Sequence, residues 1–440
     1  MAIASCPALF VAAPASGQGK TTVTAALARM LTRQGKIVRV FKTGPDYLDP
    51  QILQQASRQP VEQLDMWMAG EPYCQQKFYQ AAQVADLILV EGAMGIYDGD
   101  PSSADLAARF NIPIALVMDV KGMAQTAAAI AVGLANFRND VEFAGLIANN
   151  CGTDRHRQLI EDELPESLPL LANLPRSEEV ALPERHLGLV QAHEVAQELE
   201  ERFEAGASWL EQAGFGDFID RINVVDFHSA DVPIVSPLLS GLKIGIAKDA
   251  AFTFIYDANV RLLEAMGAEL EYFSPLHDAC LPAVDALWLP GGYPELHAQN
   301  LAENINMLAQ VKKFFEQDKP VLAECGGFLY CLQTLTDLDN QRYPMAGLLA
   351  GHGAMRGRSG CQGMQAAQLP EGEVRAHAHH RSRSAQTPEP ISHGVRQRHP
   401  ARGEAVYREK QLTASYLHFF FPSNPCAIAQ LFNPSLRGTI

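Results

Sequence analysis

The 440-residue sequence lacks three features that would assign its class directly. Its eight cysteines form no C-x-x-C pair, so we expect neither a zinc ribbon nor a disulfide framework, and a reducing cytoplasm is the compartment that fits. No apolar run reaches the roughly 20 residues that a membrane helix needs. The apolar start, residues 1–13, has no basic leading region, so we interpret it as a buried strand and not as a signal peptide.

An excess of positive charge is also missing. The chain has 35 Lys and Arg against 50 Asp and Glu, a formal net charge of −15. This balance argues against a nucleic-acid partner, although one local basic pocket for an anionic small molecule is compatible with it. With 47% hydrophobic and 19% charged residues the composition is that of a packed globular protein. At about 150 residues per domain, the length predicts more than one domain.

Short apolar runs alternate with amphipathic helical stretches in the first half of the chain. This alternation predicts an α/β domain with a doubly wound, mostly parallel sheet. The alternation weakens between residues 173 and 237 and resumes at Leu242. We therefore expect a first domain at 1–195, a linker region at 196–241 and a second α/β domain at 242–440. The expected strands of the first domain are 8–13, 37–41, 87–90, 114–118 and 143–148.

A glycine-rich loop separates the first expected strand from a helical stretch, which is the context that a phosphate loop requires. Glycines let backbone N–H groups close on phosphates, a lysine adds charge at the outer phosphates, and a threonine can ligand Mg²⁺. The strict pattern has a glycine where Pro14 stands, so this is a variant loop, and a plain tight turn is the alternative. The predicted ATP-binding residues are Gly17, Gly19, Lys20, Thr21 and Thr22.

Carboxylates follow the next two expected strands. Asp46 and Asp49 come after the strand that ends at Phe41, and Glu91 and Asp98 come after the strand 87–90. Ligands of open parallel sheets bind at the carboxyl edge, so these side chains, with Thr21, are candidates for holding Mg²⁺ and activating a substrate. For each carboxylate alone, a capping or turn role is the alternative.

A second constellation lies in the later half. Cys325 stands between a short apolar strand and two glycines, which resembles a nucleophile elbow, and a thiolate placed there can attack an amide carbonyl. Gly291 and Gly292 follow another strand and are suited to donating N–H groups to an oxyanion. His418 ends a late apolar strand and is the candidate base, with a satisfied core histidine as the alternative. The acid that often follows such a histidine by two residues is missing, because position 420 is Phe.

These motifs together resemble the cobyrinic and hydrogenobyrinic acid a,c-diamide synthase family over essentially the whole chain. The resemblance implies a dethiobiotin-synthetase-like, P-loop ATPase domain joined to a class I glutamine amidotransferase domain. Few other families combine these segments. The most specific ones are 14–22, Phe41-Lys42-Thr43-Gly44-Pro45-Asp46-Tyr47-Leu48-Asp49-Pro50, Glu91-Gly92-Ala93-Met94-Gly95-Ile96-Tyr97-Asp98-Gly99, 290–295, Glu324-Cys325-Gly326-Gly327 and Ala414-Ser415-Tyr416-Leu417-His418.

The resemblance also implies an activity. Cys325 and His418 would release ammonia from L-glutamine, and the ATPase domain would phosphorylate corrinoid carboxylates to acyl phosphates that ammonia attacks, twice per product. Tyr47 and Leu48 would lie where the side chain is selected. The absent acid after His418 fits this branch of amidotransferases, which lacks it. Mg²⁺ and ATP are the implied cofactor and co-substrate, and a homodimer is left open.

One segment departs from the family pattern Arg-Gly-His-x-Phe-His-x-Ser. The chain reads Arg375-Ala376-His377-Ala378-His379-His380-Arg381-Ser382, without the aromatic residue. A zinc site of the three histidines is one interpretation, although no Cys or carboxylate completes the set nearby. The arginines of 375–383 would meet a polycarboxylate, and a solvated loop is the alternative.

Two competing functions remain open. The same chemistry would serve another tetrapyrrole acid such as nickel-sirohydrochlorin, or later carboxylates of the corrinoid. A partition-type regulatory ATPase with a second domain used only for binding is the alternative from a different class, and the paired Cys325 and His418 argue against it.

Overall fold

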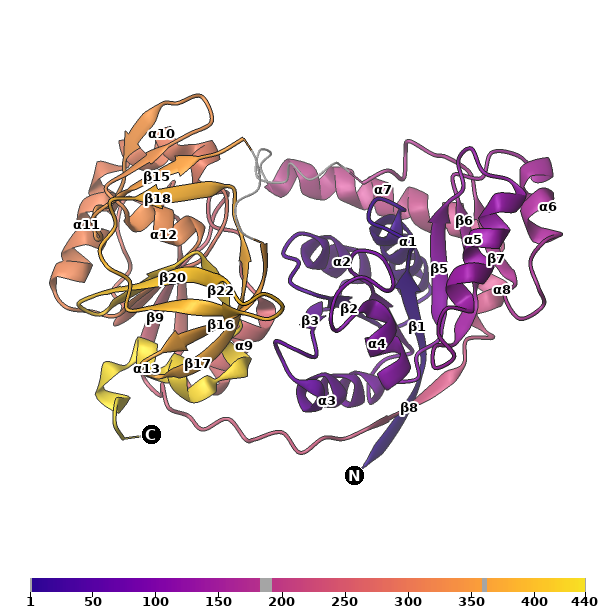
Figure 1. Ribbon diagram of the computed structural model, residues 1–440, viewed down its shortest axis with the longest axis horizontal. Helices are drawn as coiled ribbons and strands as arrows, with labels where there is room; N and C mark the ends of the chain where they lie inside the picture. Colours follow the sequence, from indigo (N-terminus) through magenta and orange to yellow (C-terminus); the bar gives the residue numbers. More distant parts are fainter. Residues whose placement is uncertain (1, 183–191, 358–361, 440) are drawn as a thin grey trace. The chain divides into compact units, whose positions relative to one another are not determined.

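The computed structural model describes residues 2–182, 192–357 and 362–439, which form two compact units. The first unit comprises the described residues up to Val232, and the second comprises those from Pro233 onwards. Figure 1 labels the helices and strands of both. Among the described helices, none combines the length and the apolar character required to cross a membrane.

The first unit is built on an eight-stranded sheet with the order β3-β2-β4-β1-β5-β6-β7, in which all neighbours are parallel. The eighth strand, β8, pairs antiparallel with the start of β1. The strands are β1 (Ile3–Ala12), β2 (Val38–Thr43), β3 (Glu62–Leu64), β4 (Leu87–Glu91), β5 (Ile114–Asp119), β6 (Phe143–Asn149), β7 (Leu170–Leu174) and β8 (Val224–His228). The helices are α1 (Lys20–Arg33), α2 (Asp49–Ser57), α3 (Glu71–Ala82), α4 (Ser103–Arg109), α5 (Gln125–Ala135), α6 (Asp154–Glu161), α7 (Ala192–Gln212) and α8 (Gly216–Ile219).

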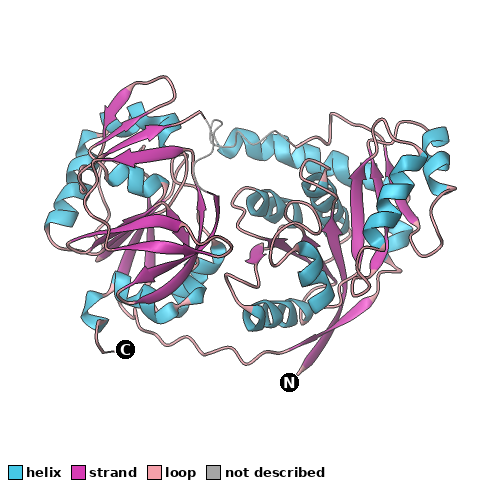
Figure 2. Ribbon diagram, in the orientation of Figure 1, coloured by secondary structure: helices cyan, strands magenta, loops and turns pink. Residues whose placement is uncertain are grey.

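Alternate residues of the central strand β1 supply two cores, because successive strand side chains point to opposite faces. Leu9 and Val11 belong to the core that also contains residues of α1, α2 and α7. Ala8 and Phe10 belong to the core under α3 and α4. Helices therefore cover both faces of a parallel sheet, as Figure 2 shows, and the predicted doubly wound α/β class is confirmed.

The linker expected at 196–241 is wrong for residues 196–232, which are folded into the first unit. Helix α7 packs along α1, where Arg29 bonds to Glu200 and, at 2.9 Å, to Glu204. Phe203 of α7 is 1% exposed and enters the core. Part of the region where the alternation weakens is therefore an amphipathic helix that packs on the first unit.

The second unit contains a ten-stranded sheet with the order β10-β9-β11-β12-β21-β20-β19-β16-β17-β22. The first five strands in this order are parallel, and the neighbours from β21 to β22 are antiparallel. A four-stranded sheet, β14-β13-β15-β18, lies apart from it. The strands are β9 (Lys243–Ala247), β10 (Glu269–Phe273), β11 (Ala286–Leu289), β12 (Val321–Glu324), β13 (Thr334–Thr336), β14 (Arg342–Pro344), β15 (His352–Met355), β16 (Gln362–Leu369), β17 (Gly372–His379), β18 (Ser382–Ala385), β19 (Ser392–Arg396), β20 (Arg402–Glu409), β21 (Leu412–Ser415) and β22 (Leu417–Phe419).

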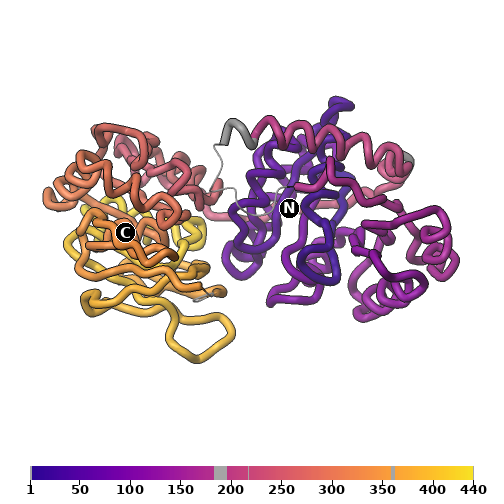
Figure 3. Tube along the Cα trace, turned by 90° about the horizontal axis from the view of Figure 1, so that it is seen from above, coloured from indigo at the N-terminus to yellow at the C-terminus, as the bar shows by residue number. Residues whose placement is uncertain are grey.

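Helices flank the parallel part of this sheet, and the chain can be followed through them in Figure 3. Leu287 and Leu289 of β11 face a core shared with α10, α11 and α12, whereas Trp288 between them faces a core shared with α9 and α13. The expected second α/β domain is confirmed, and its antiparallel half was not anticipated. The helical elements are α9 (Asp257–Ala265), η1 (Pro294–His297), α10 (Ala298–Glu303), α11 (Ile305–Glu316), α12 (Gly326–Cys331), η2 (Phe421–Ser423), α13 (Pro425–Phe432) and η3 (Pro434–Leu436).

Candidate active sites

The predicted phosphate loop joins β1 to α1 in the first unit. Gly17 and Gly19 have φ of +78° and +96°, a region that other residues rarely adopt. A Cβ on Gly19 would lie 2.4 Å from Nδ2 of Asn149, so a side chain there would also displace the Asn149 amide. Lys20 Nζ donates to the carbonyl oxygens of Ala15 at 3.2 Å and Met94 at 2.8 Å. The loop therefore has the backbone shape that phosphate binding needs, and its lysine is tied to the segment after β4. Thr21 and Thr22 lie in the first turn of α1.

A buried ionic cluster lies beside this loop. Thr21 Oγ1 donates to Glu91 Oε1 at 2.9 Å, and Lys42 Nζ lies 2.6 Å from the same oxygen and 2.9 Å from Asp49 Oδ2. Glu91 is 0% exposed, and burial raises the pKa of its carboxyl group, which the Lys42 ammonium opposes. Three of the predicted residues, Thr21, Asp49 and Glu91, are thus brought together. Sequence reasoning missed Lys42, although it stands within a quoted motif.

The cluster fits Mg²⁺ bound together with phosphates. Glu91 Oε2 is buried without a hydrogen-bond partner, and Thr21 and Asp49 offer the oxygen ligands that Mg²⁺ prefers. Within the described ranges, no three His, Cys, Asp or Glu side chains are grouped closely enough to hold a metal unaided. Mg²⁺ characteristically completes its shell with water and phosphate oxygens, so these residues match a metal that arrives with ATP.

Two further candidates of the first unit, Asp46 and Asp98, accept hydrogen bonds from nearby backbone N–H groups. Asp46 Oδ1 accepts from the N–H groups of Leu48 and Asp49 at 3.0 and 3.1 Å, and Asp98 Oδ2 accepts from Gly95 N–H at 3.0 Å. Burial and the neighbouring Asp49 raise the pKa of Asp46. Tyr47 is buried and Leu48 is half-buried. Both aspartates therefore shape the turns that present Asp49 and Glu91.

The elbow at Cys325 lies between β12 and α12 in the second unit. Cys325 has φ +46° and ψ −99°, an uncommon conformation for a residue with a side chain. Its N–H donates to Ser415 O at 2.8 Å, and its Sγ lies 3.8 Å from His379 O. Strained backbone of this kind clusters at catalytic positions. Burial, followed by the charge of Glu295, raises the pKa of the thiol, so a base is needed to produce the thiolate.

The glycine pair and His418 meet at this elbow. A Cβ added to Gly291 would lie 2.2 Å from Cε1 of His418, and one added to Gly326 would lie 2.9 Å from the backbone nitrogen of Gly292. His418 is 2% exposed, and burial lowers its pKa, with further lowering by His377, His379 and His380. A neutral imidazole is the form that accepts a thiol proton. The candidate nucleophile, base and oxyanion donors are thus drawn together from distant parts of the chain.

Substituting Gly291 with alanine tests this packing. The added methyl group would displace the His418 imidazole, and a displacement of about 1 Å costs about 100-fold in rate. We expect glutamine-dependent product formation to fall by this factor while ammonia-dependent formation is unchanged, measured with each nitrogen source. Gly357→Ala is the matched control, because no atom lies within 4 Å of its added Cβ and its backbone needs no positive φ. Equal activity of the two variants would contradict the assignment.

The histidine-rich segment forms part of the same surroundings. His377 pairs with His418 across β17 and β22, and burial, followed by His379, lowers the pKa of His377 to about 3. The His380 ring stacks on Tyr416 with centroids 3.9 Å apart, and its Nε2 lies 3.3 Å from Glu404 Oε1. The described part of the chain contains no group of three ligating residues, so the zinc interpretation gains no support. Sequence reasoning did not single out Tyr416 or Glu404.

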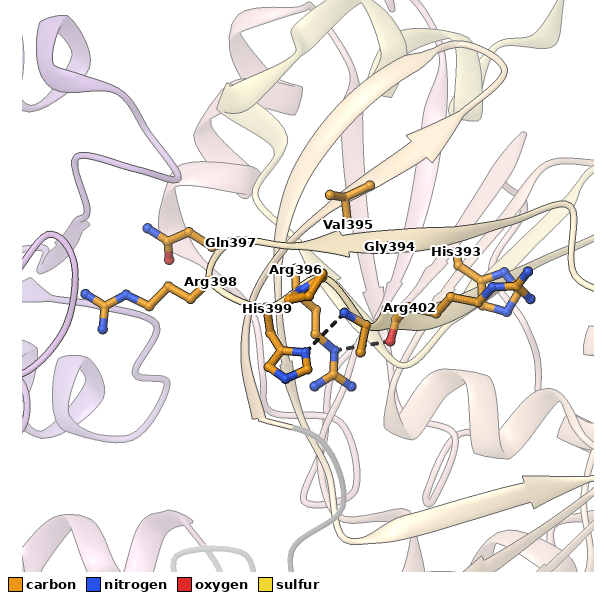
Figure 4. A pocket seen from close by; sticks show the side chains of 10 residues that line it. His393, Gly394, Val395, Arg396, Gln397, Arg398, His399 and Arg402 are labelled. Atoms are coloured by element: carbon orange, nitrogen blue, oxygen red, sulfur yellow. Dashed lines mark hydrogen bonds between the residues drawn. The ribbon is translucent and has the colours of Figure 1, made fainter.

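A basic hollow of about 450 Å³ lies apart from these candidates, in the β19–β20 hairpin. Figure 4 shows its side chains, with Arg396 Nε donating to Arg402 O at 3.2 Å and Ala401 N–H donating to His399 Nδ1 at 3.1 Å. It is lined only by residues 393–402 of the hairpin itself and contains no predicted site residue.

Comparison with known proteins identifies both units of the chain. Residues 9–190 match the family model of the CobQ/CobB/MinD/ParA nucleotide binding domain, and residues 243–426 match that of the CobB/CobQ-like glutamine amidotransferase domain. The protein therefore joins a nucleotide-binding domain to a glutamine amidotransferase domain.

Its relatives define the family more closely. The chain is 50% identical to the hydrogenobyrinate a,c-diamide synthase of Stutzerimonas stutzeri, over 98% of this chain and 99% of the relative. It is 49% identical to the enzyme of the same name from Pseudomonas aeruginosa, over 99% of both chains. It is 44% identical to the cobyrinate a,c-diamide synthase of Herminiimonas arsenicoxydans, over 98% of this chain and 97% of the relative. The chain belongs to the cobyrinate and hydrogenobyrinate a,c-diamide synthase family, as its motifs predicted.

Proposed function

We propose that the protein uses ATP and ammonia from L-glutamine to amidate the a and c side-chain carboxylates of a corrinoid acid in cobalamin biosynthesis. The observation that carries the proposal is the presence, on one chain, of the Lys20 loop with its carboxylates and of the Cys325 elbow with His418. Each alone is compatible with other enzymes, but a ligase that hydrolyses glutamine requires both.

In the glutaminase half-reaction, His418 takes the proton of the Cys325 thiol, and the thiolate attacks the amide carbon of glutamine. The N–H groups at Gly291 and Gly292 stabilise the oxyanion. His418 returns its proton to the departing nitrogen, which leaves as ammonia, and water then hydrolyses the thioester to glutamate and free Cys325.

In the ligase half-reaction, the Gly17–Thr22 loop and Lys20 orient the ATP phosphates, and an oxygen of the substrate carboxylate attacks the γ-phosphorus as ADP leaves. Ammonia then attacks the carbonyl carbon of the acyl phosphate, forming the amide and releasing phosphate. Thr21, Asp49 and Glu91 would hold Mg²⁺, which would supply neutralising charge at the phosphates. Asp46 and Asp98 shape the turns at the carboxyl edge of the first sheet. Tyr47 and Leu48 are assigned to selecting which side chain of the corrinoid is amidated.

The acceptor is tested by an ATP- and glutamine-dependent assay with hydrogenobyrinic acid and cobyrinic acid side by side, following product mass. The two relatives at 49% and 50% identity carry the name of the metal-free acid, so we expect a diamide from hydrogenobyrinic acid. A diamide from only the cobalt form would reassign the acceptor within the family. Turnover of ATP and glutamine with neither acid amidated would favour another tetrapyrrole, such as nickel-sirohydrochlorin.

The cellular setting is part of the same proposal. Seven cysteines of the described residues are free thiols, which suits the reducing cytoplasm where a biosynthetic enzyme of this kind would act. A homodimer remains an expectation and carries no step of the mechanism.

A further inference from the structure

The carboxyl group of Glu324 has no part in the chemistry described above, yet Glu324 precedes Cys325 and its carboxyl group bonds to the residue after His418. Glu324 ends β12 and precedes Cys325. Its Oε1 accepts from the backbone N–H of Phe419, the residue after His418, at 2.7 Å. Its Oε2 accepts from Nε1–H of Trp288 at 2.7 Å. One side chain therefore joins the nucleophile strand to the strand of the base.

Burial of this carboxyl group costs free energy, because its charged form is removed from water. Glu324 is 2% exposed, and burial raises its pKa to about 8, against the opposing effect of its two hydrogen bonds. Both partners are neutral donors, and no Lys or Arg charge among the described residues contributes to the pKa shift of this carboxyl group. Well-packed apolar residues in place of buried charges are often neutral or stabilising. Stability alone therefore gives little reason for an acid here, which points to a role in the site.

The neighbouring backbone shows what that role is. Phe420 occupies the place where many glutamine-hydrolysing enzymes carry the acid that orients the imidazole, so orientation of His418 has to come from elsewhere. Strand β22 is only three residues long. Cys325 is fixed to β21 by its bond to Ser415 O, and β12 pairs with β21 in register at Glu324 and Ser415. The Glu324 bond to Phe419 N–H extends this frame to the residue that follows His418.

We propose that Glu324 is a positioning residue, whose hydrogen bond to Phe419 N–H fixes β22 so that the His418 imidazole is held at Cys325. Glu324 would orient the imidazole in place of the missing acid. It lies on the strand that leads to Cys325 and acts through the backbone of the residue after His418. This inference rests on the proposed glutaminase roles of Cys325 and His418.

The experiment separates the hydrogen bond from the acidic group and from the packing. In a Trp288→Phe background no indole donor competes for the side chain at position 324, so Glu324→Gln keeps an acceptor for Phe419 N–H and removes the ionisable group. Glu324→Met in the same background removes the acceptor and keeps the length. Glutamine hydrolysis is measured as kcat and KM, with the unfolding temperature of each variant and ammonia-supported amidation alongside.

We expect Trp288→Phe and its Glu324→Gln derivative to have the same kcat, and the Glu324→Met derivative to lose about 100-fold in kcat at unchanged KM, as a small misplacement of the base requires. Unchanged kcat in the methionine variant would overturn the proposal. So would an equal loss in the glutamine variant, which would assign the effect to the acidic group, or a change confined to KM. If the Trp288→Phe background does not fold, Glu324→Met is compared with the wild-type chain, and an unchanged kcat there overturns the proposal.

Failure of this inference is distinguishable from failure of the proposed function. If Cys325→Ala still hydrolyses glutamine, the glutaminase assignment itself is wrong. If Cys325→Ala is inactive and the methionine variant is fully active, only the role of Glu324 is wrong.

Discussion

Replacement of Cys325 by alanine is expected to reduce glutamine-dependent amidation by at least about 1,000-fold, because loss of a catalytic nucleophile removes the whole covalent route. Amidation supported by free ammonium is expected to continue at the wild-type rate, since only the source of ammonia is lost. Product is quantified by mass with each nitrogen source at equal protein concentration. The two sources therefore report separately on the two units of the chain.

Cys331 provides a matched control for this substitution. It is a buried thiol in α12, six residues after Cys325, and no catalytic role is assigned to it. Cys331→Ala should keep glutamine-dependent activity, which excludes a general effect of thiol removal from this core. Loss of ammonium-dependent activity in Cys325→Ala would contradict the assignment, because it would give the thiol a task outside glutamine hydrolysis.

The sequence predicted correctly those elements whose strand, loop and helix follow one another directly along the chain. Strand, glycine loop and helix follow one another within 3–33, and Cys325 is the single residue between β12, which ends at Glu324, and α12, which begins at Gly326. The antiparallel pairing of Ile3–Pro7 with β8 was nevertheless not predicted. A partner more than 200 residues away leaves no mark on the local alternation of apolar residues.

The expected linker failed for a related reason. Residues 194–204 are rich in charge and lie where the alternation of apolar runs and helical stretches weakens. The buried positions of α7, Phe203, Ala207 and Leu210, recur at three- and four-residue intervals, which is the spacing of a helix with one apolar face. The signal was present, but the charged residues around it obscured it.

The contacts that supporting residues make in both sites could not be predicted from the sequence. Lys42 and Glu324 stand inside motifs that were recognised, yet their tasks depend on partners at Glu91 and Phe419 that only the folded chain brings near. The acid missing at position 420 was visible from the sequence, whereas the buried acid that contacts the neighbouring peptide was not. Motif spacing predicts which residues react, and tertiary packing decides which residues hold them.

Lys20 is the residue whose loss should stop amidation from both nitrogen sources. Phosphate positioning by the Lys20 loop precedes acyl phosphate formation, and ammonia from either source attacks that same intermediate. Lys20→Ala is therefore expected to lower both glutamine- and ammonium-dependent product formation by at least about 100-fold, because positioning and charge stabilisation make up almost all of phosphoryl-transfer catalysis.

The measurement follows ADP release and product mass together, with Lys36→Ala as the matched control. Lys36 is exposed, just beyond the end of α1, and has no assigned contact with the site, so its variant should keep both activities. Lys20 Nζ bonds to Ala15 O and Met94 O, so alanine also unties the loop from the segment after β4. Retained ammonium-dependent amidation in Lys20→Ala would mean that the carboxylate is activated elsewhere, and the ligase assignment of the first unit would be wrong.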